Sequence, residues 1–407
     1  MKNNAFNRRS FLKTSMLGTA GAFLGNRLTA SETKKSLHLA GNKNKIVKRE
    51  LGNTGIKLPV VSFGVMRADN PNLVNAAMDA GIEHFDTAHK YQKGNNETML
   101  GEVLKNYPRD SFTIATKIPE PGEEKDEKTG ELVPGFSKKY FMEKLDISLK
   151  RLQMDYVDIL YFHSLSRRET VLYEPILDAL QTAKKEGKAR HIGLTTHSNE
   201  HEVIKAATDS GVYEVVLTAI NFKQNHRDKI LHRIEEASKA GLGIIAMKTM
   251  AGGRIGKGEN QKMKYQAALK WALNNPHIHT SIPGITAFEE LDENMAVMND
   301  LSLSNEEKDF LLYAANSTEG LYCDGCKECM KACPKDIPIP DMMRAYMYAH
   351  GYRETLKAKQ ELEELGITDN PCGNCNQCTV NCPKGFNVPE KIADISRIAE
   401  VPDEFLV

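Results

Sequence analysis

The sequence predicts an α/β fold in two parts, a closed (β/α)8 TIM barrel followed by a small, mainly helical C-terminal domain. Eight short β-rich runs alternate with amphipathic helical patterns, which is the layout of parallel βα units. Eight such units over about 250 residues favour a closed barrel. No GxGxxG motif follows the first strand, as it would in an open dinucleotide-binding sheet. All 8 cysteines come after the barrel pattern has ended, which indicates a second domain.

The composition is that of an ordinary globular protein, with 41% hydrophobic and 27% charged residues. Because 54 Lys and Arg balance 54 Asp and Glu, no basic excess indicates a nucleic-acid partner. No apolar run approaches the roughly 20 residues of a membrane-spanning helix, so we expect a soluble mature protein. The expected boundaries are a signal over 1–30, a linker over 31–45, the barrel over 46–315 and the cysteine-rich domain over 316–407.

The first thirty residues have the layout of an export signal. The paired Arg8 and Arg9 in "NRRSFLK" precede a short, weakly apolar segment rich in Gly and Ala. This closely resembles a twin-arginine signal, which exports folded proteins and predicts a periplasmic location. Cleavage near "LTA" (28–30) and retention as a membrane anchor both stay open. The alternative to an export signal is a basic N-terminus that has frayed ends and no targeting role.

The predicted strands are short runs rich in β-branched and aromatic residues. They span 60–66, 83–88, 112–117, 157–163, 189–196, 214–221, 242–249 and 279–284. Helical patterns lie between them, as in "YFMEKLDISLKRLQ" (140–153), whose apolar residues recur every three or four positions. In "HRDKILHRIEEASKAG" (226–241), Gly241 is suited to end the helix.

Polar side chains follow neighbouring strands where a parallel barrel places its chemistry, at the C-terminal strand ends. Asp86, Lys117 and His163 come at the ends of the second, third and fourth strands, and Tyr91 follows shortly after the second. Tyrosine is a feeble acid, so we expect the Lys117 ammonium to lower the Tyr91 pKa while Asp86 holds the lysine. Tyr91 could then donate a proton to a carbonyl oxygen, and His163 could orient the carbonyl or relay the proton.

At these residues the chain resembles the aldo-keto reductase family over about residues 46–305. The matching segments are "RELGNTGIKLPVVSFG", "FDTAHKYQKGNNETMLGEVLK", "TIATK", "DYVDILYFHS", "ARHIGLTTHS" and "SIPGITAFEELDEN". The resemblance implies a (β/α)8 fold, hydride transfer between a nicotinamide and an aldehyde or ketone, and a catalytic tetrad. The family's tetrad falls on Asp86, Tyr91, Lys117 and His163. Singly, each of these residues also has a structural interpretation, as a cap, a core histidine or a solvated lysine.

The nicotinamide end departs from the family pattern. Thr195 and Thr196 stand where the family usually has Ser-Asn to hold the carboxamide of the nicotinamide. The hydroxyl of Thr195 can still form a hydrogen bond, but Thr196 lacks the side-chain amide of Asn. Leu217 and Ile220 align with the family's Gln and stacking aromatic residue. The stacking platform is therefore expected to be absent.

The phosphate end departs as well. Gly284 and Glu290 stand where the family often has Lys and Arg to grip the 2′-phosphate of NADP. Two missing charge-assisted bonds, worth roughly 1.5–3 kcal/mol each, argue against a preference for NADP. Lys248 is a candidate replacement charge or a solvated lysine. The candidate NAD(P)-binding residues are Thr195, Thr196, Lys248, Gly284 and Asn294.

An acidic insertion, residues 119–136, follows the third strand on the catalytic face. It is rich in turn residues at both ends. It is either a solvated loop or a lid over the barrel mouth, since loops on this face shape the substrate pocket.

The cysteines form two runs of identical spacing, each followed by proline. The runs are Cys323, Cys326, Cys329, Cys333 and Cys372, Cys375, Cys378, Cys382. CxxCxxCxxxCP is the ligand run of bacterial ferredoxins with [4Fe-4S] clusters. Disulfides and structural zinc are the competing interpretations, but neither requires the doubled spacing or the prolines.

The resemblance to two-cluster ferredoxins implies crossed ligation, in which the fourth cysteine of each run serves the other cluster. One predicted cluster is held by Cys323, Cys326, Cys329 and Cys382. The other is held by Cys372, Cys375, Cys378 and Cys333. The segment between the runs reads as two helices, so the tail resembles a ferredoxin module.

Three functions remain open. In the first, a periplasmic oxidoreductase interconverts a carbonyl and an alcohol at Tyr91 while two clusters link the site to a redox partner protein. In the second, the barrel is a conventional NAD(P)H reductase whose clusters are structural. In the third, the barrel is a scaffold and only the clusters act, as an electron carrier. Export by the twin-arginine machinery suits all three, because clusters are assembled on folded protein in the cytoplasm.

Overall fold

The computed structural model describes residues 46–119, 136–252, 261–316, 321–375 and 378–406. The predicted signal, the linker and most of the acidic insertion lie outside these residues. Within the described part of the chain, no helix combines the length and the apolar character that crossing a membrane requires.

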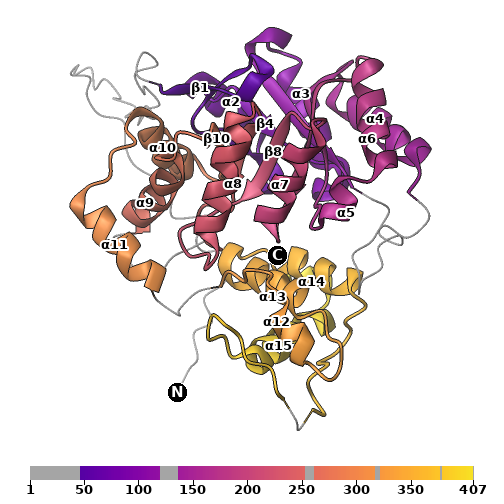
Figure 1. Ribbon diagram of the computed structural model, residues 1–407, viewed down its shortest axis with the longest axis vertical. Coiled ribbons are helices and arrows are strands. Elements are labelled where there is room, and N and C mark those ends of the chain that lie inside the picture. Colours follow the sequence, from indigo (N-terminus) through magenta and orange to yellow (C-terminus); the bar gives the residue numbers. More distant parts are fainter. Residues whose placement is uncertain (1–45, 120–135, 253–260, 317–320, 376–377, 407) are drawn as a thin grey trace, which may run out of the picture. The chain divides into compact units, whose positions relative to one another are not determined.

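Eight parallel strands form the predicted barrel, in the sequential order β3 to β10 (Figure 1). They are β3 (Phe63–Gly64), β4 (His84–Asp86), β5 (Thr113–Ile118), β6 (Val157–Phe162), β7 (Ala189–Thr196), β8 (Val215–Ala219), β9 (Gly243–Met247) and β10 (Thr280–Ser281). Parallel bridges from Val61 to Ser281 and from Gly64 to Gly284 join the first strand region to the last. The sheet therefore closes on itself, and the predicted fold class is confirmed.

Helices alternate with the strands around the barrel. They are α2 (Pro71–Ala80), α3 (Asn95–Leu104), α4 (Lys138–Leu152), α5 (Arg168–Val171), α6 (Glu174–Lys185), α7 (Glu200–Ser210), α8 (Arg227–Lys239), α9 (Gln261–Leu273), α10 (Phe288–Asn299) and α11 (Asn305–Asn316). Short 3₁₀ turns are η2 (Gly52–Thr54), η3 (Val65–Arg67), η4 (Tyr91–Gly94) and η5 (Arg109–Ser111).

Helix α4 shows how the sequence pattern becomes packing. The Ser137 side chain accepts a hydrogen bond from the Tyr140 backbone N–H and so caps the first turn. The helix ends at Gln153, which adopts the left-handed conformation. Its apolar stripe is buried against the sheet, and each fully buried large side chain contributes about 1.5–3 kcal/mol. The buried stripe consists of Phe141, Leu145, Leu149 and Leu152.

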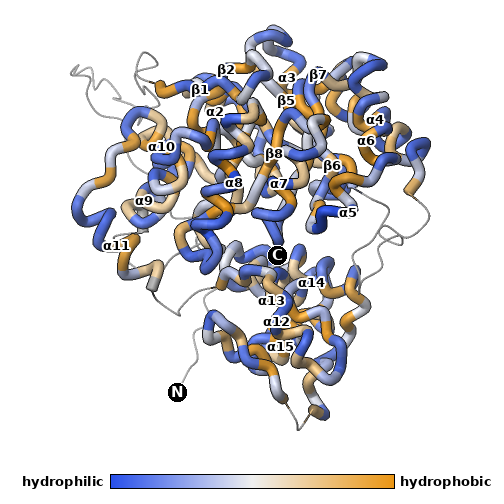
Figure 2. The backbone as a smooth tube through the Cα atoms, viewed as in Figure 1, coloured by the Kyte–Doolittle hydropathy of each residue, from blue (hydrophilic) through white to orange (hydrophobic). Residues whose placement is uncertain are grey.

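A hairpin of β1 (Lys48–Glu50) and β2 (Lys57–Pro59) precedes the barrel and was not predicted. Its strands are short and largely charged, so they lack the apolar alternation of a half-buried strand. Leu51 and Leu58 of the hairpin are fully buried and pack with the side chains inside the barrel. The barrel interior is therefore a filled core. Figure 2 shows the difference between inner and outer elements: strand β8 is mostly apolar, whereas apolar and polar residues alternate along helix α8.

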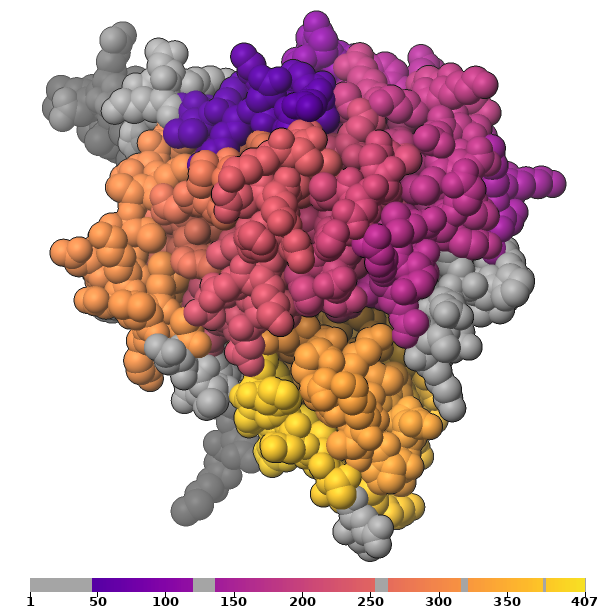
Figure 3. Space-filling model, viewed as in Figure 1, coloured from indigo at the N-terminus to yellow at the C-terminus, as the bar shows by residue number. Residues whose placement is uncertain are grey.

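The cysteine-rich segment forms a helical module with its own buried core. Its elements are α12 (Glu328–Ala332), α13 (Ile339–Met347), the π-helical turn η6 (Tyr348–Tyr352), α14 (Thr355–Glu364), α15 (Val388–Ser396), η7 (Arg397–Glu400) and η8 (Asp403–Phe405). Helices α13 and α14 are the two expected between the cysteine runs, whereas the π turn that joins them was not expected. Atoms of the earlier part of this module, in orange, and of its last part, in yellow, adjoin on the surface in Figure 3.

Candidate active site and cluster-binding module

The structure brings the four predicted catalytic residues together at the C-terminal strand ends. Asp86 is the last residue of β4, Lys117 lies near the end of β5, His163 follows β6 and Tyr91 begins η4. The Lys117 Nζ donates to Asp86 Oδ1 and, at 2.6 Å, to the Thr87 carbonyl oxygen. It lies 5.0 Å from the centre of the Tyr91 ring. The rings of Tyr91 and His163 are 6.2 Å apart and nearly perpendicular.

The electrostatics of Tyr91 differ from the sequence-based expectation. Burial, followed by the Asp86 carboxylate, holds the pKa of Tyr91 well above its usual value. Burial also raises the pKa of Asp86 and lowers that of Lys117, while their mutual attraction opposes both shifts. The expectation that Lys117 lowers the Tyr91 pKa was wrong, because Asp86 balances the ammonium charge and desolvation dominates. In the free enzyme Tyr91 is therefore a protonated phenol and a weaker acid than free tyrosine.

Tyr161 lies beside this group inside the barrel and was not predicted as a site residue. It pairs in register with Lys117 on the neighbouring strand, so both side chains leave the sheet on the same face. Its hydroxyl and the Asp86 Oδ2 are both buried without a hydrogen-bond partner in the described structure. Gly193 makes room for the ring, since a Cβ there would lie 2.9 Å from Tyr161 Cδ1. In the sequence, the available signal was its position in the fourth predicted strand, two residues before His163 and so on the same face.

His197 is a second residue that sequence reasoning missed. Its ring lies 6.2 Å from that of His163, and its Nδ1 is buried without a hydrogen-bond partner in the described structure. Burial, followed by the charge of Lys248, keeps the pKa of His197 well below its usual value. A neutral imidazole therefore continues the row of rings that begins at Tyr91. The sequence offered only its position, directly after Thr195 and Thr196.

The two threonines predicted to hold a carboxamide are fully buried at the end of β7. The Thr195 hydroxyl accepts a hydrogen bond from the Ser164 backbone N–H at 2.8 Å. The Thr196 hydroxyl donates to the Ser198 carbonyl oxygen at 2.9 Å. Leu217 and Ile220 are also fully buried, so neither presents a stacking surface. Nicotinamide binding by the threonines stays a prediction.

Most of the predicted phosphate end lies in one segment, from the last strand region into α10 (Phe288–Asn299). Gly284 forms the barrel-closing bridge, and the Asn294 side chain on α10 donates to the Glu290 carbonyl oxygen at 2.7 Å. The Glu290 carboxylate accepts hydrogen bonds from the backbone N–H and the hydroxyl of Thr286, which hold it at the start of α10. Lys248 is half-buried after β9, and burial followed by repulsion from Arg344 lowers its pKa to about 8. Phosphate binding by Gly284, Asn294 and Lys248 stays a prediction.

The cysteines fall into the two crossed sets that the sequence predicted. Cys329 interacts electrostatically with Cys326 and with Cys382 of the second run. Cys372 interacts in the same way with Cys375, Cys378 and, from the first run, Cys333. A small cavity is lined by all four members of the second set. All 8 cysteines are free thiols, so the disulfide alternative has no support in this structure.

The donor set fits iron–sulfur clusters. Burial, with neighbouring thiols adding to it, raises the pKa of Cys323 to about 12 and that of Cys329 to about 11. Thiols with such pKa values are deprotonated by iron, which supplies the opposing charge. Among the described residues, no three His, Cys, Asp or Glu form a preassembled cage for a single ion. The spacing of each run and the proline that follows it are those of bacterial ferredoxins with [4Fe-4S] clusters.

The cysteine-rich module is bonded to the loops that surround the barrel's catalytic end. Asp324 accepts from the Asn225 backbone N–H at 3.1 Å and from Lys384 Nζ at 2.8 Å. The same Lys384 ammonium donates to the Lys223 carbonyl oxygen at 3.0 Å. Asp324 adjoins the first cysteine run and Lys384 follows the second. One ion pair therefore fastens both runs to the loop after β8.

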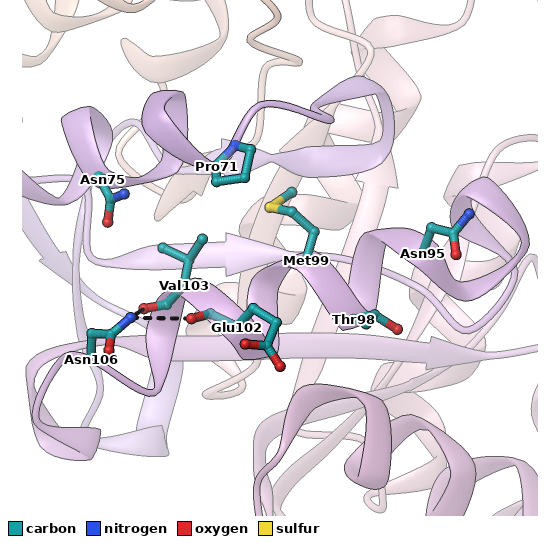
Figure 4. Close-up of a pocket in the computed structure, with 8 residues that line it drawn as sticks. All are labelled: Pro71, Asn75, Asn95, Thr98, Met99, Glu102, Val103 and Asn106. Carbon is teal, nitrogen blue, oxygen red and sulfur yellow. Dashed lines mark hydrogen bonds between the residues drawn. The ribbon is translucent and has the colours of Figure 1, made fainter.

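A groove of about 550 Å³ lies elsewhere, on the outer surface between α2 and α3 (Figure 4). Its lining residues are Pro71, Asn75, Asn95, Thr98, Met99, Glu102, Val103 and Asn106. None of the predicted site residues lines it. The groove is therefore not assigned to the chemistry of the tetrad.

These features define an oxidoreductase-type barrel joined to an iron–sulfur module. The family model described as the aldo/keto reductase family matches residues 62–267, about half of the chain. The chain belongs to the aldo/keto reductase family. A 4Fe-4S dicluster domain model matches residues 322–388, which contain all 8 cysteines.

Curated relatives agree with this assignment, and a solved structure agrees with the fold. L-galactose dehydrogenase from Arabidopsis thaliana is 29% identical over 63% of this chain and 89% of its own length. L-glyceraldehyde 3-phosphate reductase from Escherichia coli K12 is 26% identical over 64% of this chain and 89% of its own length. A holo aldo-keto reductase from Bacillus halodurans has a TM-score of 0.53 at 23% identity, covering 67% of this chain and 97% of that one. The chain is thus an oxidoreductase with a 4Fe-4S dicluster domain.

Proposed function

We propose that this protein interconverts a carbonyl and an alcohol with Tyr91 as proton donor and acceptor, and that two [4Fe-4S] clusters carry the electrons. The observation that carries the proposal is the assembled tetrad at the barrel end to which the cysteine-rich module is bonded. Reduction of a carbonyl takes two electrons and two protons. Tyr91 gives the proton on oxygen, and a nicotinamide held in the barrel would give the hydrogen on carbon together with two electrons, as hydride. Two clusters that each change by one electron would exchange those two electrons between the nicotinamide and a partner protein.

The residues of the chain perform the proton chemistry. The Tyr91 phenol donates a hydrogen bond to the carbonyl oxygen and then transfers its proton as negative charge develops there. The phenolate left behind lies under the Lys117 ammonium, which stabilises it, and Asp86 fixes that ammonium in place. His163, edge-on to the phenol, orients the carbonyl. A nicotinamide, when bound, would supply or accept hydride at this site.

Tyr91→Phe tests the proton-donor role. The variant keeps the ring that lies beside Lys117 but removes the phenol proton, so turnover should fall by about 10²–10⁴. Turnover is measured anaerobically with glyceraldehyde and reduced methyl viologen as a one-electron donor, and cluster absorbance should match that of the parent protein. Unchanged turnover would rule out Tyr91 as the donor.

Titration with nucleotides tests the electron route. We expect NADPH to have no advantage over NADH, because Gly284 and Glu290 offer no cation to the 2′-phosphate. Anaerobic protein is titrated with each nucleotide while cluster bleaching in the visible range is followed. Bleaching by either would establish communication between hydride and cluster chemistry. Turnover with NADPH and no exchange with the clusters would favour the conventional reductase with structural clusters.

The predicted signal belongs to this proposal, since clusters are assembled before export and a twin-arginine route moves folded cargo. Replacing both Arg8 and Arg9 with lysine in the full chain should leave the protein in the cytoplasm. Fractionation of cells and immunodetection measure this. Periplasmic protein at the parental level would contradict the assignment of the signal.

A further inference from the structure

Two junctions join the cysteine-rich module to the barrel. At the first, a Cβ placed on Gly351 in η6 would clash with the Gly252 carbonyl oxygen, so the approach requires glycine. On the same turn, Arg67 donates to the Tyr352 carbonyl oxygen at 2.8 Å and to Glu354 at 2.7 Å. This junction lies in the segment between the two cysteine runs.

The second junction is formed by the first cysteine run itself. A Cβ placed on Gly325 of this run would lie 3.0 Å from the Ser198 Cβ, in the loop after β7. The Gln224 side-chain amide, in the loop after β8, lies 3.5 Å from the Tyr322 hydroxyl, directly before the run. The first run therefore packs against loops at the C-terminal strand ends of the barrel.

A buried ion pair belongs to this second junction. Asp324 Oδ1 lies 2.8 Å from Lys384 Nζ, and the two side chains are only 5% and 15% exposed. The other Asp324 oxygen accepts from the Asn225 backbone N–H at 3.1 Å. Lys384 Nζ also donates to the Lys223 carbonyl oxygen at 3.0 Å. The backbone of the barrel loop thus holds both charges in place.

Both charges adjoin ligands of the same predicted cluster. Asp324 follows Cys323 directly, and Lys384 lies two residues after Cys382. The Gly325 backbone N–H donates to Cys323 Sγ at 3.4 Å. Net charge and hydrogen bonds to sulfur are among the properties that set the reduction potential of an iron–sulfur cluster. Because the pair is buried, water screens its charges little.

The surroundings of the second predicted set are different. The charged residues within three positions of its ligands are all exposed. They are Lys331, Lys335, Asp336 and Asp369. Solvent screens exposed charges, so they influence a cluster less than a buried pair does. The two predicted clusters are therefore not electrostatically equivalent.

We propose that the ion pair of Asp324 and Lys384 sets the reduction potential of one cluster and leaves that of the other nearly unaffected. The cluster concerned is the one predicted on Cys323, Cys326, Cys329 and Cys382. Reduction adds a negative charge to it, which the Asp324 carboxylate disfavours and the Lys384 ammonium favours. The inference rests on the clusters of the proposed function, and it makes the contact with the barrel a determinant of their potentials.

Two variants test the pair by removing one charge each while keeping a side chain that can hydrogen bond. Asp324→Asn should favour reduction of the cluster at least tenfold, which raises its potential by about 59 mV. Lys384→Gln should disfavour reduction by a similar factor. Anaerobic titration of the full protein with dithionite, followed by EPR, measures both changes. Only one cluster's share of the signal should move.

Glu328→Gln and Lys331→Gln are the matched controls. These residues belong to the same cysteine run and form an ion pair of similar length, 2.7 Å, but their side chains are 50% and 71% exposed. Each control should change the reduction equilibrium by less than about twofold. Equal shifts in the buried and exposed variants would overturn the particular role of the buried pair.

Ligand variants identify the cluster that responds. Cys326→Ser alters the first set and Cys378→Ser the second, and both cysteines are exposed. The potential that shifts in Asp324→Asn should be the one that Cys326→Ser changes. Lys384→Arg keeps the charge and should keep the parental potential, and iron content reports whether each variant holds its clusters. A shift of the second cluster's potential, or of neither, would contradict the proposal.

The potentials are measured without a carbonyl substrate, which separates this inference from the proposed reaction. Opposite shifts in Asp324→Asn and Lys384→Gln support the role of the pair even if the parent protein turns over no carbonyl, in which case the proposed function alone fails. Turnover in the parent protein together with unshifted potentials in both variants would retain the reaction and reject the pair.

Discussion

The pKa values of single residues at the catalytic end are shifted more by burial than by neighbouring charges. Asp86 and Lys117 are almost fully enclosed, and their ion pair persists because each would otherwise leave an uncompensated charge. Tyr91 stays protonated for the same reason, since desolvation opposes the phenolate until a substrate oxygen can take the proton. Residue types at strand ends predicted that Asp86, Lys117, His163 and Tyr91 come together, while their catalytic roles stay a prediction. The sign of the Tyr91 shift could not be predicted, because it depends on how completely the surroundings exclude water.

Tyr161 gives a prediction at this scale. Its buried hydroxyl has no hydrogen-bond partner in the described structure, so Tyr161→Phe should leave the free energy of unfolding unchanged or raise it by up to about 1 kcal/mol. The matched control is Tyr213→Phe, whose hydroxyl donates to the Val171 carbonyl oxygen at 2.8 Å. That control should lose about 1–2 kcal/mol. Denaturant unfolding measures both.

A loss of more than about 2 kcal/mol in Tyr161→Phe would contradict this expectation. It would mean that the hydroxyl supports the orphaned Asp86 Oδ2. A parallel fall in turnover would then make Tyr161 a positioning residue for the tetrad.

At the scale of elements, apolar patterning predicted every strand of the barrel, because each overlaps one of the short β-rich runs of the sequence. Most of these strands are apolar, whereas β4 (HFD) and β10 (TS) are buried but largely polar. It missed the hairpin β1–β2, whose strands are short and charged, and the π turn η6, which has no characteristic residue pattern. The junction after β8 was also beyond prediction. There, Glu200, buried at the start of α7, accepts from Gln224 at 3.0 Å and from His226 at 2.9 Å. Such a junction joins residues that are distant in sequence.

The pair of His226 and Glu200 predicts a pH dependence. The hydrogen bond to Glu200 raises the pKa of His226 above its usual 6.5, against the opposing effect of burial. The stabilisation is therefore complete below the unfolded pKa and is lost as the pH rises through the higher folded value. We expect about 1 kcal/mol to disappear between weakly acidic and alkaline pH, measured as the unfolding midpoint in denaturant.

The groups facing His226 include Asp324, which adds to the raised pKa, and Lys384, which opposes it. His201 is a further titratable neighbour, with its ring 6.0 Å away. His226→Gln should remove this pH dependence. His232→Gln, on the same helix but exposed and paired only with Glu236, should preserve it. A parental profile in His226→Gln would assign the effect to another group.

For the whole molecule, the barrel and the cysteine-rich module have separate buried cores, and they differ in what fills them. The barrel core consists of side chains from strands, helices and the plugging hairpin. The module's core is small and includes Cys329, with further cysteines packed against it. Clusters bound by those cysteines would therefore be part of the module's own interior, and so small a core depends strongly on such a centre. The sequence predicted both parts, but not that one would be fastened over the catalytic end of the other.

Iron removal tests this dependence. Chelation under reducing conditions should unfold the module while the barrel strands stay folded. Amide hydrogen exchange should rise over residues 321–375 and 378–406 and over the loops around Arg67 and Gly252, which η6 covers. Strands β5–β8 should keep their protection because their core contains no cysteine. If those strands lost protection to the same degree, the two cores would form one cooperative unit, and the clusters would stabilise the barrel itself.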